Sequence, residues 1–108
     1  MGSAVVPRND DSTNRNVAIR RERNWIHESV VSVTRAARQD KDIGQERLAN
    51  MLGWSKSVIV NLENLRRDLG VADFILLAEK VEMDPRDLFA SVMFHLRQRR
   101  SGRKPAGK

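Results

Sequence analysis

The sequence contains no cysteine, so it can form neither a disulfide framework nor a thiolate metal site. Histidine is scarce as well. His27 and His95 stand far apart, and neither lies in a pattern of neighbouring metal ligands, which favours surface or packing roles for both. We therefore expect the protein to use no metal ion and no cofactor.

Long apolar runs are also missing. The longest one, residues 74–78, is far too short to cross a membrane, and the N-terminus has no apolar stretch typical of an export signal. The chain lacks a nucleophile paired with a base, a phosphate-binding glycine loop and a carboxylate cluster, so we do not expect an enzyme. These absences predict a cytoplasmic binding protein, and the 108 residues can hold one compact domain.

Positive charge is concentrated at the two ends of the chain, whose net charge is +6 at pH 7. Residues 97–108 carry six basic residues and no acidic one, and residues 1–23 carry five basic and three acidic ones. Residues 24–96, in contrast, carry nine basic and eleven acidic residues. Basic ends suit a polyanion, because each Lys or Arg near a phosphate releases condensed counterions. A solubilising tail that binds nothing is an equally good interpretation of the charge alone.

Hydrophobic periodicity predicts an all-α domain of about five helices, with no strand alternation of useful length. Residues 1–16 are polar and are predicted to form a flexible arm, residues 17–96 the helical domain, and residues 97–108 a disordered basic tail. The first helix carries the apolar stripe Ile26, Val30, Val33 and Ala37. Asp84 and Pro85 form a strong start signal for the last helix.

Residues 43–63 predict two short helices joined by a tight turn. Gly53 suits the left-handed end of the first helix, and Ser55 can cap the second. Ala49 is small enough to let the two helices approach closely, and Trp54 can fill the core between them. This is the pattern of a helix-turn-helix, and an ordinary αα-corner of a helical protein is the alternative interpretation. Its other apolar positions are Leu48, Leu52, Val58, Ile59 and Leu62.

Together these residues resemble the lambda-repressor-like, XRE-type helix-turn-helix family. The resemblance covers residues 26–90 and implies a five-helix domain whose third helix enters the major groove, usually in a dimeric transcriptional regulator. It is carried by Gln45-Glu46-Arg47-Leu48-Ala49, Leu52-Gly53-Trp54-Ser55-Lys56-Ser57-Val58-Ile59 and Leu62-Glu63, and by the later Phe74, Leu77-Ala78, Val81, Met83-Asp84-Pro85 and Leu88-Phe89.

By position, the resemblance implies that Gln45 contacts phosphate and that Lys56, Ser57 and Asn61 face base edges, with Val60 near enough for an apolar contact. The residue types fit these roles. Lys56 can donate to guanine O6 or N7, and Asn61 can pair with adenine through two hydrogen bonds. The alternatives are a phosphate contact for Lys56 and a polar surface position for Asn61. Glu63 is expected to orient a nearby arginine or to cap locally rather than to touch DNA.

The sequence departs from the family pattern around the third helix. Leu65 replaces the glycine that usually follows this helix, so residues 64–69 are expected either to extend the helix or to form an altered loop. Arg66 and Arg67 are candidates for phosphate contacts there. Ser55, at the helix start, completes the predicted DNA-binding set. Gly44 and Gly70 stand where the family often has a serine cap.

These features predict a sequence-specific regulator of transcription that binds double-stranded DNA, a repressor of the kind used by phage and mobile elements, and hence associated with the nucleoid. An antitoxin that regulates its own operon is a second hypothesis, although no apolar stripe precedes Val17 to bind a toxin. A protein-interaction module that reads no bases is a third. The polar residues at the reading positions favour the first.

The last helix predicts a homodimer. Leu88 and Val92 can face the core, which leaves Phe89, Met93 and Leu96 as a neighbouring apolar strip that a second copy can cover. A dimer would also read two half-sites of a palindromic operator. Packing of this strip against the first helix within one protomer is the competing interpretation.

Overall fold

The computed structural model describes residues 5–102, with side chains from residue 15 onward. These residues form five helices and no strand: α1 (Val5–Asp40), α2 (Gln45–Leu52), α3 (Lys56–Glu63), α4 (Val71–Lys80) and α5 (Pro85–Gly102). The all-α, five-helix prediction is therefore confirmed. No helix within this range is long and apolar enough to cross a membrane.

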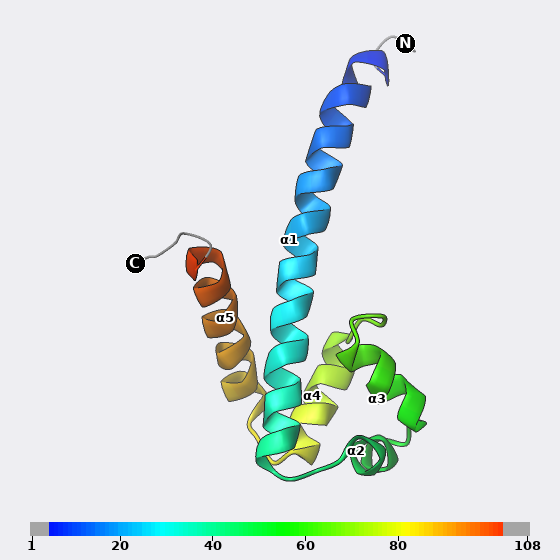
Figure 1. Ribbon diagram of the computed structural model, residues 1–108, viewed down its shortest axis with the longest axis vertical. Coiled ribbons are helices and arrows are strands. Elements are labelled where there is room, and N and C mark those ends of the chain that lie inside the picture. Colours follow the sequence, from blue (N-terminus) through cyan, green and yellow to red (C-terminus); the bar gives the residue numbers. More distant parts are fainter. Residues whose placement is uncertain (1–4, 103–108) are drawn as a thin grey trace.

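The long helix α1 lies between α5 and a group of three short helices (Figure 1). α5 packs along one side of α1, and α2, α3 and α4 form a lobe on the other, joined to α1 mainly through α3. α1 therefore buries residues on two faces. Val31, Thr34 and Arg38 are buried in addition to Ala37, the only fully buried member of the predicted stripe. A single stripe was too simple a prediction because α1 has neighbours on both sides.

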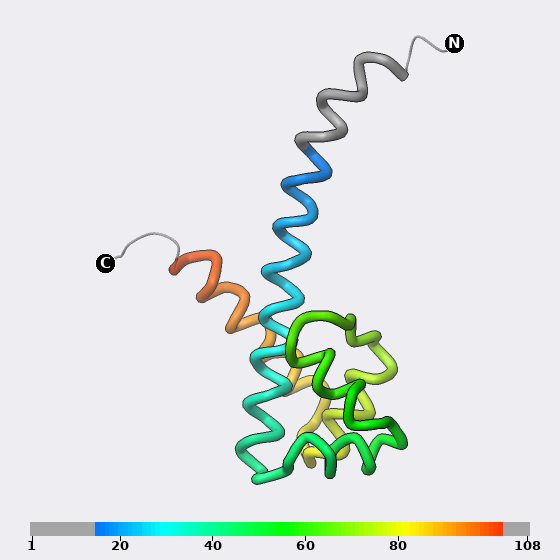
Figure 2. Tube along the Cα trace, turned by 45° about the vertical axis from the view of Figure 1, so that its right-hand side comes forward, coloured from blue at the N-terminus to red at the C-terminus, as the bar shows by residue number. Residues whose placement is uncertain are grey.

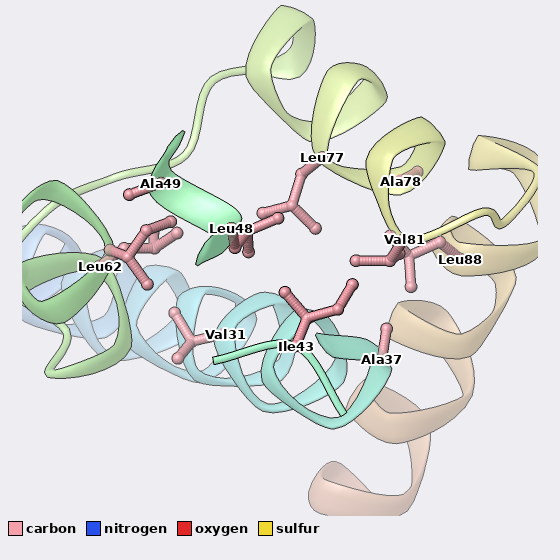
Figure 3. Close-up of a cluster of buried hydrophobic side chains, with 11 residues drawn as sticks. Val31, Ala37, Ile43, Leu48, Ala49, Leu62, Leu77, Ala78, Val81 and Leu88 are labelled. Carbon is pink, nitrogen blue, oxygen red and sulfur yellow. The ribbon is translucent and has the colours of Figure 1, made fainter. Parts of the chain in front are cut away.

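The hydrophobic core lies where the lobe meets the C-terminal half of α1 (Figure 3). Side chains from α1, α2 and α4 point toward one another there, and Ile43, in the loop after α1, lies among them. Burial of apolar surface at this scale is the main force that assembles short helices. The cluster comprises Val31, Ala37, Ile43, Leu48, Ala49, Ile59, Leu62, Leu77, Ala78, Val81 and Leu88.

Polar contacts attach α5 to α1 beyond the core. Ser29 is fully buried, and its Oγ lies 2.9 Å from His95 Nδ1. Farther from the core, Arg99 forms an ion pair with Glu28 at 2.8 Å and lies over the ring of Trp25. These contacts hold the two helices together as far as the last turns of α5.

The predicted domain boundaries at residues 16/17 and 96/97 both fall inside continuous helices (Figure 2). Residues 97–102 belong to α5, where the sequence predicted the start of a disordered tail. The difference has a physical cause, because Arg99 and Arg100 pair with Glu28 and Glu22 of α1. The division into arm, domain and tail stays a prediction, and residues 1–4 and 103–108 lie outside the described residues.

Helices α1 to α4 all end in the same hydrogen-bond pattern. After α2, Gly53 adopts φ 74°, its N–H donates to the Asn50 carbonyl, and the Trp54 N–H donates to the Ala49 carbonyl at 2.8 Å. This is a Schellman motif, which needs one left-handed residue. At the other three ends that residue is not glycine: Asp42, Leu65 and Glu82 have φ values of 58°, 64° and 62°.

The predicted start of α5 is confirmed. Asp84 precedes Pro85, and its Oδ1 accepts a hydrogen bond from the Arg86 N–H at 2.8 Å. Hydrogen bonds from the Arg86 side chain, and then from its backbone, lower the pKa of the Asp84 carboxyl to about 2. Gly44 and Gly70 occupy the caps of α2 and α4 and offer no side-chain cap.

The left-handed residues generate a stability prediction. A left-handed backbone conformation costs a residue with a Cβ about 1–2 kcal/mol, and replacement by glycine removes this strain. Part of that stabilisation is offset because glycine has greater conformational freedom in the unfolded chain. Leu65→Gly and Glu82→Gly should each raise the free energy of unfolding by about 0.5–1 kcal/mol, measured by urea denaturation. The control is Glu79→Gly, in the helical backbone of α4, which should lower it. A lower free energy of unfolding in both test variants would contradict the left-handed conformation of Leu65 and Glu82.

Candidate nucleic-acid interface

Helices α2 and α3 are joined by a short turn, residues 53–55, of the length found in a helix-turn-helix. α2 ends at Leu52, Gly53 makes the left-handed turn, and Ser55 is the N-cap of α3. Ala49 is completely buried, and Trp54 is half-buried against the core, as the sequence predicted for both. The turn therefore fixes the direction of α3 relative to the rest of the protein.

α3 buries one face and exposes the other. Ile59 and Leu62 are buried in the core, whereas Ser57 and Asn61, one helical turn apart, are exposed on the opposite side. Lys56 is exposed at the first position of the helix, and Val60 is half-buried beside the exposed face. The predicted base-reading residues therefore lie together on a surface that solvent, and hence a ligand, can reach.

A buried ion pair fixes α3 to α1. The Arg38 guanidinium donates to Glu63 through Nε at 2.8 Å and through Nη2 at 3.0 Å. Its Nη1 also donates to the Ile43 carbonyl at 2.7 Å, and Gln45 Nε2 donates to Glu63 Oε1 at 2.9 Å. One network thus joins α1, the following loop, α2 and the last residue of α3. It confirms the prediction that Glu63 orients an arginine.

Arg38 was not among the residues predicted to pair with Glu63. A signal was present, because Arg38 follows the buried Val31 and Thr34 at helical steps of three and four. An arginine in such a series needs a buried acceptor, since an unpaired buried charge costs several kcal/mol. Glu63, at the end of the apolar series Ile59 and Leu62, is the matching case on α3.

Gln45 and Ser55 both have partners within the protein. Gln45 is half-buried, and its bond to Glu63 uses one of the two N–H groups of its amide, so a second donor is left for a phosphate. Ser55 Oγ lies 3.0 Å from Ser57 Oγ and makes no hydrogen bond to the backbone of α3. Ser55 is therefore the predicted N-cap by position but not by side-chain hydrogen bond.

The loop after α3 has the altered form that the sequence left open. α3 ends at Glu63, and Leu65 takes the left-handed conformation, so the helix is not extended. Arg66 and Arg67 are exposed in this loop, and Asp68 lies 3.9 Å from His27 Nδ1 of α1. Asn64, which was not predicted as a site residue, is exposed three positions after Asn61 and so extends the exposed polar face of α3.

The predicted apolar strip on α5 needs one correction. Phe89 and Met93 are 54% and 42% exposed, but Leu96 is only 4% exposed. Leu88, Val92 and Leu96 recur every four residues and form the face that packs inside the protomer, so Leu96 belongs to the core-facing series. Phe94, at 61% exposure, was missed. Phe89 also meets Phe74 of α4 edge to face, with ring centroids 6.2 Å apart.

The arrangement of these helices is shared with a known protein family. A protein-family model described as helix-turn-helix matches residues 35–88, which is half of the chain. The chain belongs to the XRE-type helix-turn-helix family. Membership makes the protein a DNA-binding regulator of transcription rather than an enzyme, with double-stranded DNA as its partner. No curated protein matches the chain.

Two solved structures are similar to this XRE-type protein. An XRE-family-like protein from Pseudomonas syringae pv. tomato str. DC3000 is 26% identical, with a TM-score of 0.66 over 71% of this chain and 94% of that one. The clp gene regulator ClgR from Corynebacterium glutamicum has a TM-score of 0.67 over 72% of this chain and 83% of its own. At 15% identity, the second likeness concerns the fold alone.

The buried ion pair generates a second stability prediction. Arg38→Met or Glu63→Leu alone should lower the free energy of unfolding by about 3–5 kcal/mol, because each leaves an uncompensated buried charge. The double variant should lose far less than the sum of the two, as measured by urea denaturation.

The exposed pair Lys41–Glu82, 3.6 Å apart, offers a matched control. Lys41→Met should change the free energy of unfolding by less than about 1 kcal/mol, because surface pairs are screened by water. Additive losses in the Arg38 and Glu63 variants would show that the two side chains do not act as a pair.

Proposed function

We propose that this XRE-type protein is a sequence-specific repressor that reads a palindromic operator as a homodimer. The proposal rests mainly on the exposed polar face of α3, a helix that the buried Arg38–Glu63 pair holds in a fixed position against α1. A reading helix must keep its side chains in register with base edges, and a buried network with two charge-assisted hydrogen bonds limits its movement. Repression would follow from occupancy of an operator that overlaps a promoter.

Base reading is assigned to the exposed face of α3. Lys56 and Asn61 have the donors and acceptors that discriminate guanine and adenine in the major groove. Ser57 can donate or accept, and Val60 lies where it can contact a thymine methyl group. Asn64 extends the same face by one turn.

Phosphate contacts are assigned to the rim of this face. Gln45 stands at the start of α2 with one free amide N–H, and Ser55 stands at the start of α3. Arg66 and Arg67 are exposed in the loop after α3. Such contacts set the position of a protein on the duplex without carrying sequence information.

Dimerisation is assigned to the outer face of α5 and the adjoining surface of α4. Phe89 and Met93 are exposed there, and Phe89 lines an apolar groove with Val71, Phe74 and Ile75. Exposed apolar side chains grouped in this way are usual at protein interfaces. A two-fold dimer would place two copies of α3 about 34 Å apart, one helical turn of DNA.

The assignment of base reading predicts a specific loss of discrimination. Lys56→Ala and Asn61→Ala should each cost about 1–3 kcal/mol in binding to the selected operator and change binding to random duplex little. Titration of labelled duplexes by fluorescence anisotropy measures both. Arg47→Ala, on the exposed side of α2, serves as a control for general loss of charge. Equal losses on operator and random DNA would reduce both residues to phosphate contacts.

The assignment of the dimer interface predicts a monomer on charge insertion. Phe89→Glu/Met93→Glu should sediment as a folded monomer with weak operator binding, because paired carboxylates would be buried at the interface. Ser91→Glu/Gln98→Glu adds the same charge to exposed positions elsewhere on α5 and should stay dimeric. Analytical ultracentrifugation measures both. A wild-type protein that is monomeric at high micromolar concentration would exclude this interface.

A further inference from the structure

Five exposed arginines lie on α1 and α5, toward the two ends of the described chain. Arg15 and Arg21 belong to α1, and Arg97, Arg99 and Arg100 to α5. We call these five residues the arginine cluster. Arg100 pairs with Glu22 and Arg99 with Glu28, each at 2.8 Å, so two acidic side chains hold the helices together and leave a net charge of about +3 in this region.

Helical register places Arg15 and Arg21 on the side of α1 that carries α5. Arg15 lies seven residues before Glu22, the partner of Arg100. Arg21 lies four residues before Trp25 and seven before Glu28, both of which contact Arg99. Residues four or seven positions apart share a helix face, so Arg15 faces the same way as Glu22, and Arg21 faces the same way as Trp25 and Glu28. The two arginines flank the side of α1 that carries α5. All five arginines are exposed.

The reading helix lies on the other side of α1. α3 is attached to α1 through Arg38 and Glu63, and its loop through His27 and Asp68. Figures 1 and 2 both show the part of α1 before this lobe projecting beyond α2, α3 and α4. Twelve residues separate Arg15 from His27, which is about 18 Å of helix. A duplex seated on α3 therefore faces away from the arginine cluster.

The charge of the rest of the protein makes this separation significant. Residues 24–96, which contain the reading helix, have an acidic excess, and the positive charge of the protein lies at its ends. Exposed guanidinium groups bind phosphates through paired N–H donors, and they do so without regard to base sequence. An arginine cluster of this kind suits the backbone of nucleic acid better than a protein groove.

We propose that the arginine cluster is a second binding site for the phosphate backbone of duplex DNA, which lets the protein hold a second DNA segment while α3 reads the first. The proposal rests on the proposed function in one respect, the seating of the first duplex on α3. It adds a bridging activity to operator recognition. The second contact is independent of sequence and weakens as salt is raised.

The test asks whether protein bound to one duplex can capture a second duplex. Operator duplex is fixed to beads and loaded with the full-length protein, and a fluorescent duplex of unrelated sequence is then added at about 0.1 M salt, where charges interact over about 10 Å. Wild-type protein should retain the second duplex. Arg15→Gln/Arg21→Gln should bind the operator within about twofold of wild type and retain about tenfold less of the second duplex.

The same helix supplies a matched control. Arg20 and Arg23 are exposed and lie seven and four residues before His27, so they share its side of α1 rather than that of α5. Arg20→Gln/Arg23→Gln removes the same charge and should retain the second duplex within about twofold of wild type. Thermal unfolding, monitored by circular dichroism, checks that both variants keep the helical fold.

Three results would overturn the proposal. Wild-type protein that holds the operator but no second duplex lacks the second site, while the proposed function stands. Equal losses in the two variants would show a general effect of charge. Retention that survives Arg15→Gln/Arg21→Gln would assign the second duplex to another surface, such as the second reading helix of a dimer. Absence of any operator binding would instead contradict the proposed function itself.

Discussion

Arg38 and Glu63 form the contact on which the position of α3 and its exposed polar face depends. α3 has only eight residues, too few for a stable helix in water, so tertiary contacts must fix its position. Its apolar side chains bind it to the core, but apolar contacts alone allow sliding and rotation. The two directional hydrogen bonds from Arg38 to Glu63, and a third from Gln45, remove that freedom at the C-terminal end of α3. The Gly53 turn defines the other end.

α1 is the common support of two surfaces with different chemistry. On one side it holds the α2–α4 lobe and, through it, the exposed polar face of α3. On the other it holds α5, whose inner face is closed by Leu88, Val92 and Leu96 and whose outer face carries apolar and basic side chains. Each surface requires a separate face of α1, which explains why this helix alternates apolar, small polar and charged residues without one simple stripe.

Local signals in the sequence predicted the elements well, and three-dimensional relations were predicted poorly. Gly53, Ser55 and Asp84-Pro85 mark helix ends through backbone chemistry within a few residues, so the turn and the start of α5 could be predicted. The burial of Leu96 and of Arg38 agrees with helical spacing, but spacing does not identify which helix covers them or which side chain pairs with Arg38. The course of α5 through residues 97–102 depends likewise on Glu22 and Glu28, which are distant in sequence.

The central claim is that a rigid α3 reads bases in a two-fold operator. Selection of bound duplexes from a random pool tests it most directly, because sequence preference and half-site spacing are measured together. The account predicts an enriched, approximately palindromic sequence whose half-sites lie about one helical turn, roughly 34 Å, apart. A pool that binds without enrichment of any sequence would contradict it and leave the protein as a DNA-binding module that recognises the backbone alone.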